Sequence, residues 1–208
     1  MAWKVRPTVE FAFVASGLIV ASTGWLADLL GLVALGGEAD HGTGDLFFRM
    51  NMLFFALGLA GIGVGFQHQA RFFRDPVFAL RYLAGYVILA DGFLHAYAFN
   101  DHLGEPLQAS FFAVVAPLQI GVGLALPYGP RRWIHGSLVM TAGLIAAYVA
   151  TRTVEVWPVS EIEEVETLGL LSKALEVFAV LLLVQLLREE RRAGRKAAAP
   201  SPGPSAEP

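Results

Sequence analysis

Lysine and arginine residues gather in a few short clusters along this chain, and acidic clusters alternate with them. Eleven of the 15 Lys and Arg residues form four clusters, namely Lys4 with Arg6, Arg71 with Arg74, Arg131 with Arg132, and the run from Arg188 to Lys196. The acidic clusters are Glu38, Asp40 and Asp45; Asp101 and Glu105; and Glu155, Glu161, Glu163, Glu164 and Glu166. Six strongly apolar stretches separate the clusters. Because short cytoplasmic loops collect Lys and Arg, this pattern predicts six membrane-spanning helices with both termini in the cytoplasm.

The composition agrees with a membrane protein. The chain has 208 residues, of which 55% are hydrophobic and 16% charged, and its mean hydropathy of +0.56 is too high for a soluble domain of this size. A bilayer core of roughly 30 Å needs about 20 apolar residues per helix, so six helices use nearly the whole chain. There is no cysteine, which excludes disulfides and thiolate metal sites.

We therefore predict an all-α, polytopic helix bundle. The expected helices cover residues 9–35, 46–66, 76–99, 109–126, 133–154 and 167–187. Residues 1–190 are expected to form this transmembrane domain, with the last helix continuing through Arg192. Residues 191–208 form a cytoplasmic tail, first basic and then rich in Ala, Pro and Ser, with disorder expected from Ala197 onward. The spacing Gly61-x-x-x-Gly65 predicts close helix packing in the membrane.

These features also predict the surroundings of the protein. The expected location is the inner (plasma) membrane of the cell, crossed several times, with the lipid bilayer as the first partner. A membrane-protein partner or a second copy of the chain is a further expectation, and no nucleic acid is expected.

Ionisable side chains inside the apolar stretches are the main functional signal, because each is costly there unless it is paired or functional. With the N-terminus inside, most of these polar groups fall in the outer half of the bundle: Asp28, Arg49, Asp91, His95, Gln119, Arg152, Lys173 and Glu176. The inner half offers mainly Glu10 and Arg81, both near the boundary. This asymmetry predicts a functional centre in the outer half.

The segment from Asp91 to Glu105 has the densest chemistry. Asp91 and His95 are four residues apart and share a helix face, so Asp91 is expected to accept a ring N–H and orient the imidazole. A metal- or haem-ligating histidine usually has such a partner. His102 lies roughly 10 Å further along, so one ion binds both histidines only if the helix breaks after Asn100. A second, solvent-facing cation site is predicted from Asp101, His102, Glu105, Asp40 and His41.

The main hypothesis is a metal- or redox-associated membrane protein, not expected to be an enzyme on its own. His95 is the intramembrane ligand, Asp91 its orienter, and His102 with Glu105 stands at the outer mouth. The cofactor is copper, zinc or haem, although haem held between two helices needs a second intramembrane histidine at this depth, which no other helix offers. The supporting polar network comprises Asp28, Arg49, Gln119, Arg152, Lys173 and Glu176.

Two other functions remain open. The buried charges of Asp91, His95, Lys173 and Glu176 could simply pair and fix helix register, as in an accessory or scaffold subunit of a membrane complex. Phe-rich faces would then meet partners or lipid. Alternatively, Asp91 and Glu176 could titrate as the carboxylates of a proton-coupled carrier for small solutes or ions. His68 and His135 lie beside basic residues and are interpreted as interfacial side chains.

Part of the chain resembles a family of uncharacterised bacterial multi-pass membrane proteins. The resemblance rests on the run Gly92-Phe-Leu-His95 to Asp101-His102-Leu-Gly-Glu105, on Ser110-Phe111-Phe112 with Gln119, on Arg152-Thr-Val, and on Gly169-Leu-Leu-Ser-Lys173-Ala-Leu-Glu176. In that pattern the third helix carries H-x6-H with an acidic residue before the second His, and the next helix carries paired aromatics and a Gln. It covers about residues 85–187, and Asn100 stands where the pattern usually has a proline. The resemblance implies one constellation of His95, His102, Gln119, Arg152 and Glu176, and no reaction.

Overall fold

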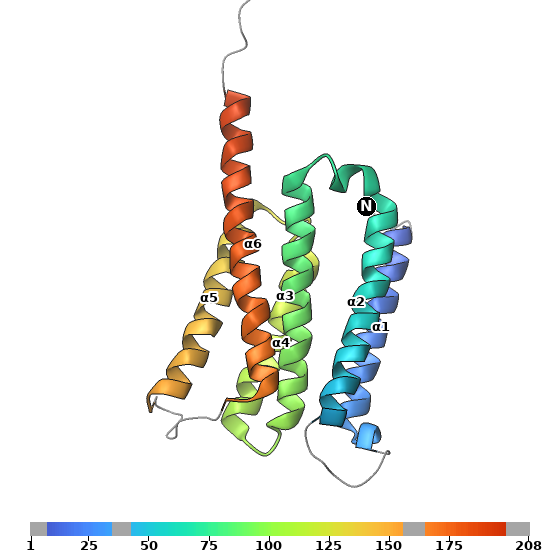
Figure 1. The fold of residues 1–208 in the computed structure, drawn as a ribbon, viewed down its shortest axis with the longest axis vertical. Coiled ribbons are helices and arrows are strands. Elements are labelled where there is room, and N and C mark those ends of the chain that lie inside the picture. The colour runs from blue at the N-terminus through green and yellow to red at the C-terminus, as the bar shows by residue number, and fades with distance from the viewer. Residues whose placement is uncertain (1–7, 35–42, 156–164, 199–208) are drawn as a thin grey trace, which may run out of the picture.

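The computed structural model describes residues 8–34, 43–155 and 165–198, and this part of the chain forms six long helices (Figure 1). The helices are α1 (Val9–Leu29), α2 (Thr43–Phe72), α3 (Pro76–Asp101), α4 (Pro106–Ala125), α5 (Arg131–Thr153) and α6 (Thr167–Ala198), with a short 3-10 helix, η1 (Leu32–Ala34), after α1. Each long helix is apolar enough to cross a membrane. The all-α, six-helix prediction is confirmed, and the chain is a multi-pass integral membrane protein.

Local signals in the sequence explain where several helices begin and end. Gly31 adopts a left-handed φ of 68°, which closes α1 several residues earlier than hydropathy predicts. Asp75 caps α3 by accepting a hydrogen bond from the Phe78 backbone N–H at 3.0 Å, and Pro76 occupies the first turn. Pro106 likewise occupies the first turn of α4, which has no side-chain cap.

Two ends differ from the sequence-based expectation in ways that matter for the site. α3 continues without a break through Asn100 to Asp101, so the break that would fold His102 back toward His95 does not occur. α6 extends to Ala198, so Ala197 and Ala198 are helical rather than disordered. The rest of the predicted tail, residues 199–208, lies outside the described residues.

α3 is the central helix of the bundle. It packs extensively against α4 and α6 and also contacts α1 and α2, which form an antiparallel pair (Figure 1). α5 packs on α6 but scarcely contacts α4. As a result most side chains in the second half of α3 are buried, including its polar ones.

Glycines on α3 and α4 let these two helices approach closely. A Cβ at Gly123 would lie 2.7 Å from the Gly85 carbonyl oxygen, so the two backbones are in direct contact. Gly61 and Gly65 instead face open space, with no atom of the described chain within 4 Å of a Cβ built there. The close packing predicted for their spacing is therefore not made among the described residues.

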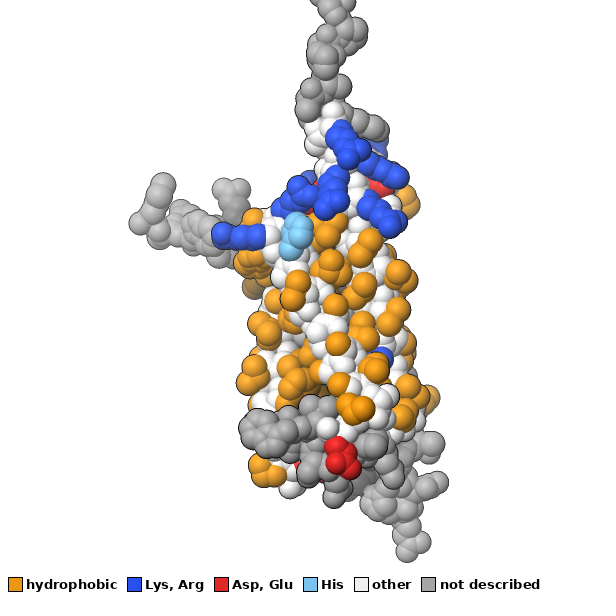
Figure 2. All heavy atoms as spheres, turned by 90° about the vertical axis from the view of Figure 1, so that its left-hand side faces the viewer, with side chains coloured by type: hydrophobic (Ala, Val, Ile, Leu, Met, Phe, Trp, Pro, Cys, Tyr) orange, Lys and Arg blue, Asp and Glu red, His pale blue; other side chains and the backbone are white. Residues whose placement is uncertain are grey.

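Charged side chains gather at the two ends of the bundle, with a broad hydrophobic band between them (Figure 2). We call the end where α6 finishes the basic end (Figure 1); its Lys and Arg residues include Arg71, Arg74, Arg131, Arg132, Arg188, Arg191 and Arg192. The opposite end is called the acidic end, and it carries Asp101, Glu105, Glu155 and Glu166. This sorting is typical of membrane proteins. Which end faces the cytoplasm stays a prediction.

Candidate metal centre

Three helices bring five polar side chains together inside the half of the bundle nearer the acidic end. Asp91 and His95 come from α3, Gln119 from α4, and Ser172 and Glu176 from α6. Their exposed fractions are 1%, 4%, 0%, 4% and 0% respectively, so all five are removed from lipid and solvent. Polar groups buried this completely must satisfy one another or bind something.

A chain of short hydrogen bonds sets the tautomer of the His95 ring. Ser172 Oγ donates to Asp91 Oδ1 and Gln119 Nε2 donates to Asp91 Oδ2, each at 2.6 Å. Since the Gln119 amide nitrogen faces Asp91, its Oε1 faces His95 Nδ1, 2.6 Å away. Nδ1 must then donate to that oxygen. The neutral ring therefore keeps its free lone pair on Nε2.

The predicted direct contact between Asp91 and His95 is replaced by a contact through Gln119. The distance from Asp91 Oδ2 to His95 Nδ1 is 3.7 Å, too long for a hydrogen bond. The amide reaches this position because α4 lies against Gly92: a Cβ there would be 2.9 Å from the backbone nitrogen of Ile120 and 3.1 Å from Gln119 Cβ. Asp91 thus orients His95 indirectly, by orienting the amide.

Glu176 lies on the other side of the His95 ring. Its Oε1 is 3.8 Å from His95 Nε2 and accepts a hydrogen bond from Lys173 Nζ, within the same helix. Its Oε2 is buried and has no hydrogen-bond partner among the described residues. A buried carboxylate oxygen without a partner is costly unless a cation approaches it.

Three of these groups can serve together as metal ligands. One ligand atom each from Asp91, His95 and Glu176 lies within 4.8 Å of the other two. Imidazole nitrogen and carboxylate oxygen suit Zn²⁺, Cu²⁺ and Fe²⁺. Gln119 and Ser172 would act as the supporting hydrogen-bond partners that usually hold ligating imidazole and carboxylate groups.

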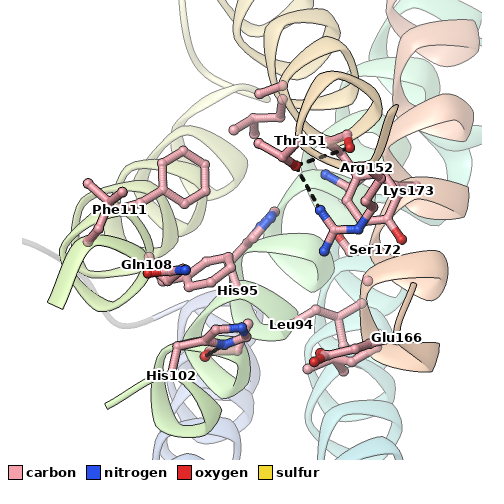
Figure 3. A pocket seen from close by; sticks show the side chains of 18 residues that line it. Leu94, His95, His102, Gln108, Phe111, Thr151, Arg152, Glu166, Ser172 and Lys173 are labelled. Atoms are coloured by element: carbon pink, nitrogen blue, oxygen red, sulfur yellow. Dashed lines mark hydrogen bonds between the residues drawn. The ribbon is translucent and has the colours of Figure 1, made fainter. Parts of the chain in front are cut away.

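A cavity of about 310 Å³ adjoins the cluster, between α3, α4, α5 and α6 (Figure 3). His95, Ser172 and Lys173 lie on its wall, which is otherwise largely apolar and aromatic. His102 lines the same cavity, and its Nδ1 bonds the Ala98 carbonyl oxygen at 2.8 Å. The two predicted histidines therefore share a cavity rather than an ion.

Arg152 and Tyr148 form the α5 side of this cavity. The Arg152 guanidinium lies 3.7 Å from the centroid of the Tyr148 ring and donates to Thr151 Oγ1 at 3.0 Å. Lys173 Nζ is 5.3 Å from the same ring centroid. The resemblance implies one constellation of five residues, which the structure divides between two places. His95, Gln119 and Glu176 lie in the buried cluster, whereas His102 and Arg152 lie on the cavity wall.

Asp28, Arg49 and Asp101 form a separate ion-pair clamp that joins α1, α2 and α3 at the acidic end. Arg49 binds the Asp28 carboxylate at 2.8 and 3.0 Å and the Asp101 carboxylate at 2.6 and 2.7 Å. Asn100 Nδ2 adds a bond to Asp28 Oδ2 at 2.7 Å. These groups hold helices together and lie outside the metal centre.

The second cation site predicted at this end is not formed by the described residues. The carboxylate of Asp101 is already paired with Arg49. Glu105 is exposed at the start of α4 and does not line the cavity. Asp40 and His41 lie outside the described residues.

One polar cluster was missed by sequence reasoning. Near the basic end, Glu10 accepts hydrogen bonds from Tyr82 at 2.7 Å and Tyr128 at 2.5 Å, and His68 Nε2 lies 2.8 Å from its other oxygen. Burial and the bond to Glu10 raise the pKa of Tyr128 to about 12, so its hydroxyl stays a donor at neutral pH. The four residues come from four different segments, and only their shared depth near the boundary could have indicated the cluster.

Comparison of the chain with known protein families, curated proteins and solved structures finds no match. The resemblance to uncharacterised bacterial membrane proteins stays a prediction.

Proposed function

We propose that this protein binds a divalent transition-metal ion inside the membrane through His95, Asp91 and Glu176. The observation that carries the proposal is the buried, unpartnered Oε2 of Glu176 beside an imidazole whose Nδ1 is already committed to Gln119. A cation there would meet one free lone pair on His95 and a carboxylate oxygen in need of a partner. We further propose the plasma membrane as its location, with both termini cytoplasmic.

The arrangement favours a single ion over haem. A haem iron takes its protein ligands along the axis of the ring, on one or both faces. Here three donor atoms, all within 4.8 Å of one another, converge from two helices. Such convergence suits tetrahedral or octahedral coordination of zinc, copper or iron.

Lys173 gives the site a way to accept the ion. Its ammonium pairs with Glu176, so the buried carboxylate is neutralised in the metal-free protein. Lys173 also lines the cavity, which offers its side chain space to withdraw when a divalent cation competes for the same oxygen. Binding would then replace one positive charge by two, which balances the two carboxylates of Asp91 and Glu176.

The cavity beside His95 suggests that the ion keeps an accessible position. Metal sites with three protein ligands commonly leave a fourth position for water or substrate. His95 and Ser172 both line the cavity, so a small molecule could reach an ion held by the cluster. The metal would supply Lewis acidity or redox chemistry at this place, and the residues around it would fix its orientation.

Cobalt titration of metal-stripped protein in detergent tests this proposal, with His95→Ala and the exposed His135→Ala as matched variants. We expect wild type and His135→Ala to bind Co²⁺ in a one-to-one complex with visible ligand-field bands, because both retain the three ligands. His95→Ala should lose the bands while circular dichroism still reports a helical protein. Absence of binding to wild type, or equal binding to His95→Ala, would overturn the proposal.

A further inference from the structure

The cavity beside the metal centre has exposed wall residues on both α4 and α5. These two helices scarcely contact each other, although both contribute to the cavity wall. On the rim, Leu107 and Phe111 of α4 are 41% and 42% exposed, and Ala147 of α5 is exposed as well. Because these exposed residues belong to helices that can span the membrane, a molecule that enters between α4 and α5 comes from the bilayer.

The cavity walls on α4 and α5 are aromatic. Phe111 and Phe112 of α4 pack with ring centroids 5.2 Å apart, and the Phe112 ring also contacts the rings of His95 and His102, at 5.7 and 5.2 Å. Tyr148 faces the cavity from α5. Figure 3 shows Phe111 on one side of the cavity and Lys173 on the other, with His95 between them. A cavity of about 310 Å³ with such walls suits a flat, single-ring head group.

The cavity wall at His95 suits a neutral hydroxyl group. His95 presents Nε2, which accepts a hydrogen bond in the tautomer that Gln119 imposes. Two cations also line the cavity: Lys173 pairs with Glu176, and Arg152 stacks on the Tyr148 ring. A phenolic O–H can donate to Nε2 without adding charge.

We propose that the cavity holds a membrane-soluble alkylated phenol or quinol, with its ring on the aromatic wall and its hydroxyl at His95. The tail leaves between α4 and α5 into lipid. This inference deepens the proposed function and rests on it for one contact. If an ion is bound, the hydroxyl oxygen would take the accessible position on the metal. In metal-free protein the hydroxyl donates to His95 itself.

Calorimetric titration of the metal-stripped full chain with 4-nonylphenol tests the cavity, using Ala147→Phe and Ala146→Phe. Both alanines are exposed neighbours on α5, but Ala147 alone lines the cavity, so only its substitution should fill the space. We expect Ala147→Phe to weaken binding by about tenfold or more and Ala146→Phe to leave it unchanged. Equal binding to all three proteins would overturn the proposal, since it would mean partition into the detergent or the protein surface.

Two further probes test the head group. 4-Nonylanisole lacks the hydroxyl donor, and we expect about tenfold weaker binding, because the His95 acceptor is left without its hydrogen bond. Nonanoate should bind more weakly than the phenol, because an ionised carboxylate has no proton to donate to His95 Nε2, and it tests whether Arg152 and Lys173 select an anion instead. An anisole that binds as well as the phenol, or a carboxylate that binds better, would contradict the phenol assignment.

Failure of the cavity inference is distinguishable from failure of the metal proposal. If wild type binds Co²⁺ but Ala147→Phe does not affect 4-nonylphenol, the metal centre stands and the cavity ligand falls. If Co²⁺ does not bind but Ala147→Phe weakens binding of 4-nonylphenol, the cavity ligand stands and the metal centre falls. A change in the Co²⁺ spectrum on adding the phenol is expected only when both are right.

Discussion

Lys173 and Glu176 hold opposite charges three residues apart on α6, in a place where neither is easily accommodated alone. Each therefore compensates the charge of the other. Asp91 is compensated differently, by hydrogen bonds from Gln119 and Ser172. What separates a metal site from a purely structural network is therefore the effect of an added cation. Lys173 is the residue at which the two accounts predict opposite results.

Lys173→Met removes the ammonium and leaves the Glu176 carboxylate buried without its partner. We expect the metal-free variant to lose about 3 kcal/mol of unfolding free energy. The same variant should bind Co²⁺ more tightly than wild type, because no cation competes for Glu176. Thermal unfolding with and without Co²⁺ checks this, with Lys173→Arg as the charge-conserving control. Equal destabilisation in both conditions would favour the structural account.

Arg49 provides a second residue-scale prediction, on stability alone. Arg49→Met leaves the buried Asp28 carboxylate uncompensated and should destabilise the bundle by about 3–5 kcal/mol. Arg49→Lys should lie between it and wild type, because an ammonium cannot bind two carboxylates in bidentate fashion. Co²⁺ binding should survive in both variants while they remain folded. The account would be wrong if Arg49→Met melted like wild type in a circular-dichroism experiment.

The sequence indicated some partners of the site and not others. The sequence could indicate two pairs, because residues three or four apart share a helix face: Asp91 with His95, and Lys173 with Glu176. The sequence could not indicate that Gln119 inserts between Asp91 and His95, since this depends on how closely α4 approaches Gly92. Relative depth and rotation of neighbouring helices are set by packing, which no single stretch of sequence reports.

Among the elements, α3 and α4 form the pair whose spacing sets the site. Gly85 and Gly123 bring their backbones into contact, and two turns further along α3 the same approach carries Gln119 to Asp91. Hydropathy found both helices but gave their ends only approximately. Gly31, Asp75 and Pro106 determine three of those ends through local backbone geometry and capping.

Gly123→Leu should separate α3 from α4. A Cβ there would lie 2.7 Å from the backbone nitrogen of Leu89, so the helices must shift apart, at a cost of about 1–3 kcal/mol or more. The shift should also weaken Co²⁺ binding by moving Gln119. Gly121→Leu is the matched control, because a Cβ at Gly121 meets nothing within 4 Å. Identical melting temperatures and Co²⁺ affinities for the two variants would show that the close approach does not position the site.

At the scale of the whole molecule, charge sorting was the strongest sequence signal and also the clearest surface feature (Figure 2). The number of membrane-spanning helices followed from it, because each apolar stretch is long enough for one crossing. The order in which helices surround α3 did not follow. The cavity did not follow from the sequence either; it lies where α4 and α5 scarcely contact each other.

The orientation in the membrane can be tested with single cysteines, since the chain has none of its own. Gly104→Cys lies in the turn at the acidic end, and Phe73→Cys in the exposed turn at the basic end. A membrane-impermeant maleimide added to intact cells should label Gly104→Cys alone, because Lys and Arg mark the cytoplasmic side. Labelling of Phe73→Cys before the cells are permeabilised would reverse the orientation.

The most direct measurement is the metal content of the protein as purified from cells, by elemental analysis of wild type beside His95→Ala. The account predicts zinc, copper or iron at close to one ion per chain in wild type, and its loss in a His95→Ala protein that keeps its helical circular dichroism. Wild type without metal, and a variant that only melts earlier, would contradict the account. The buried charges of Asp91, Lys173 and Glu176 would then serve to hold the helices in register.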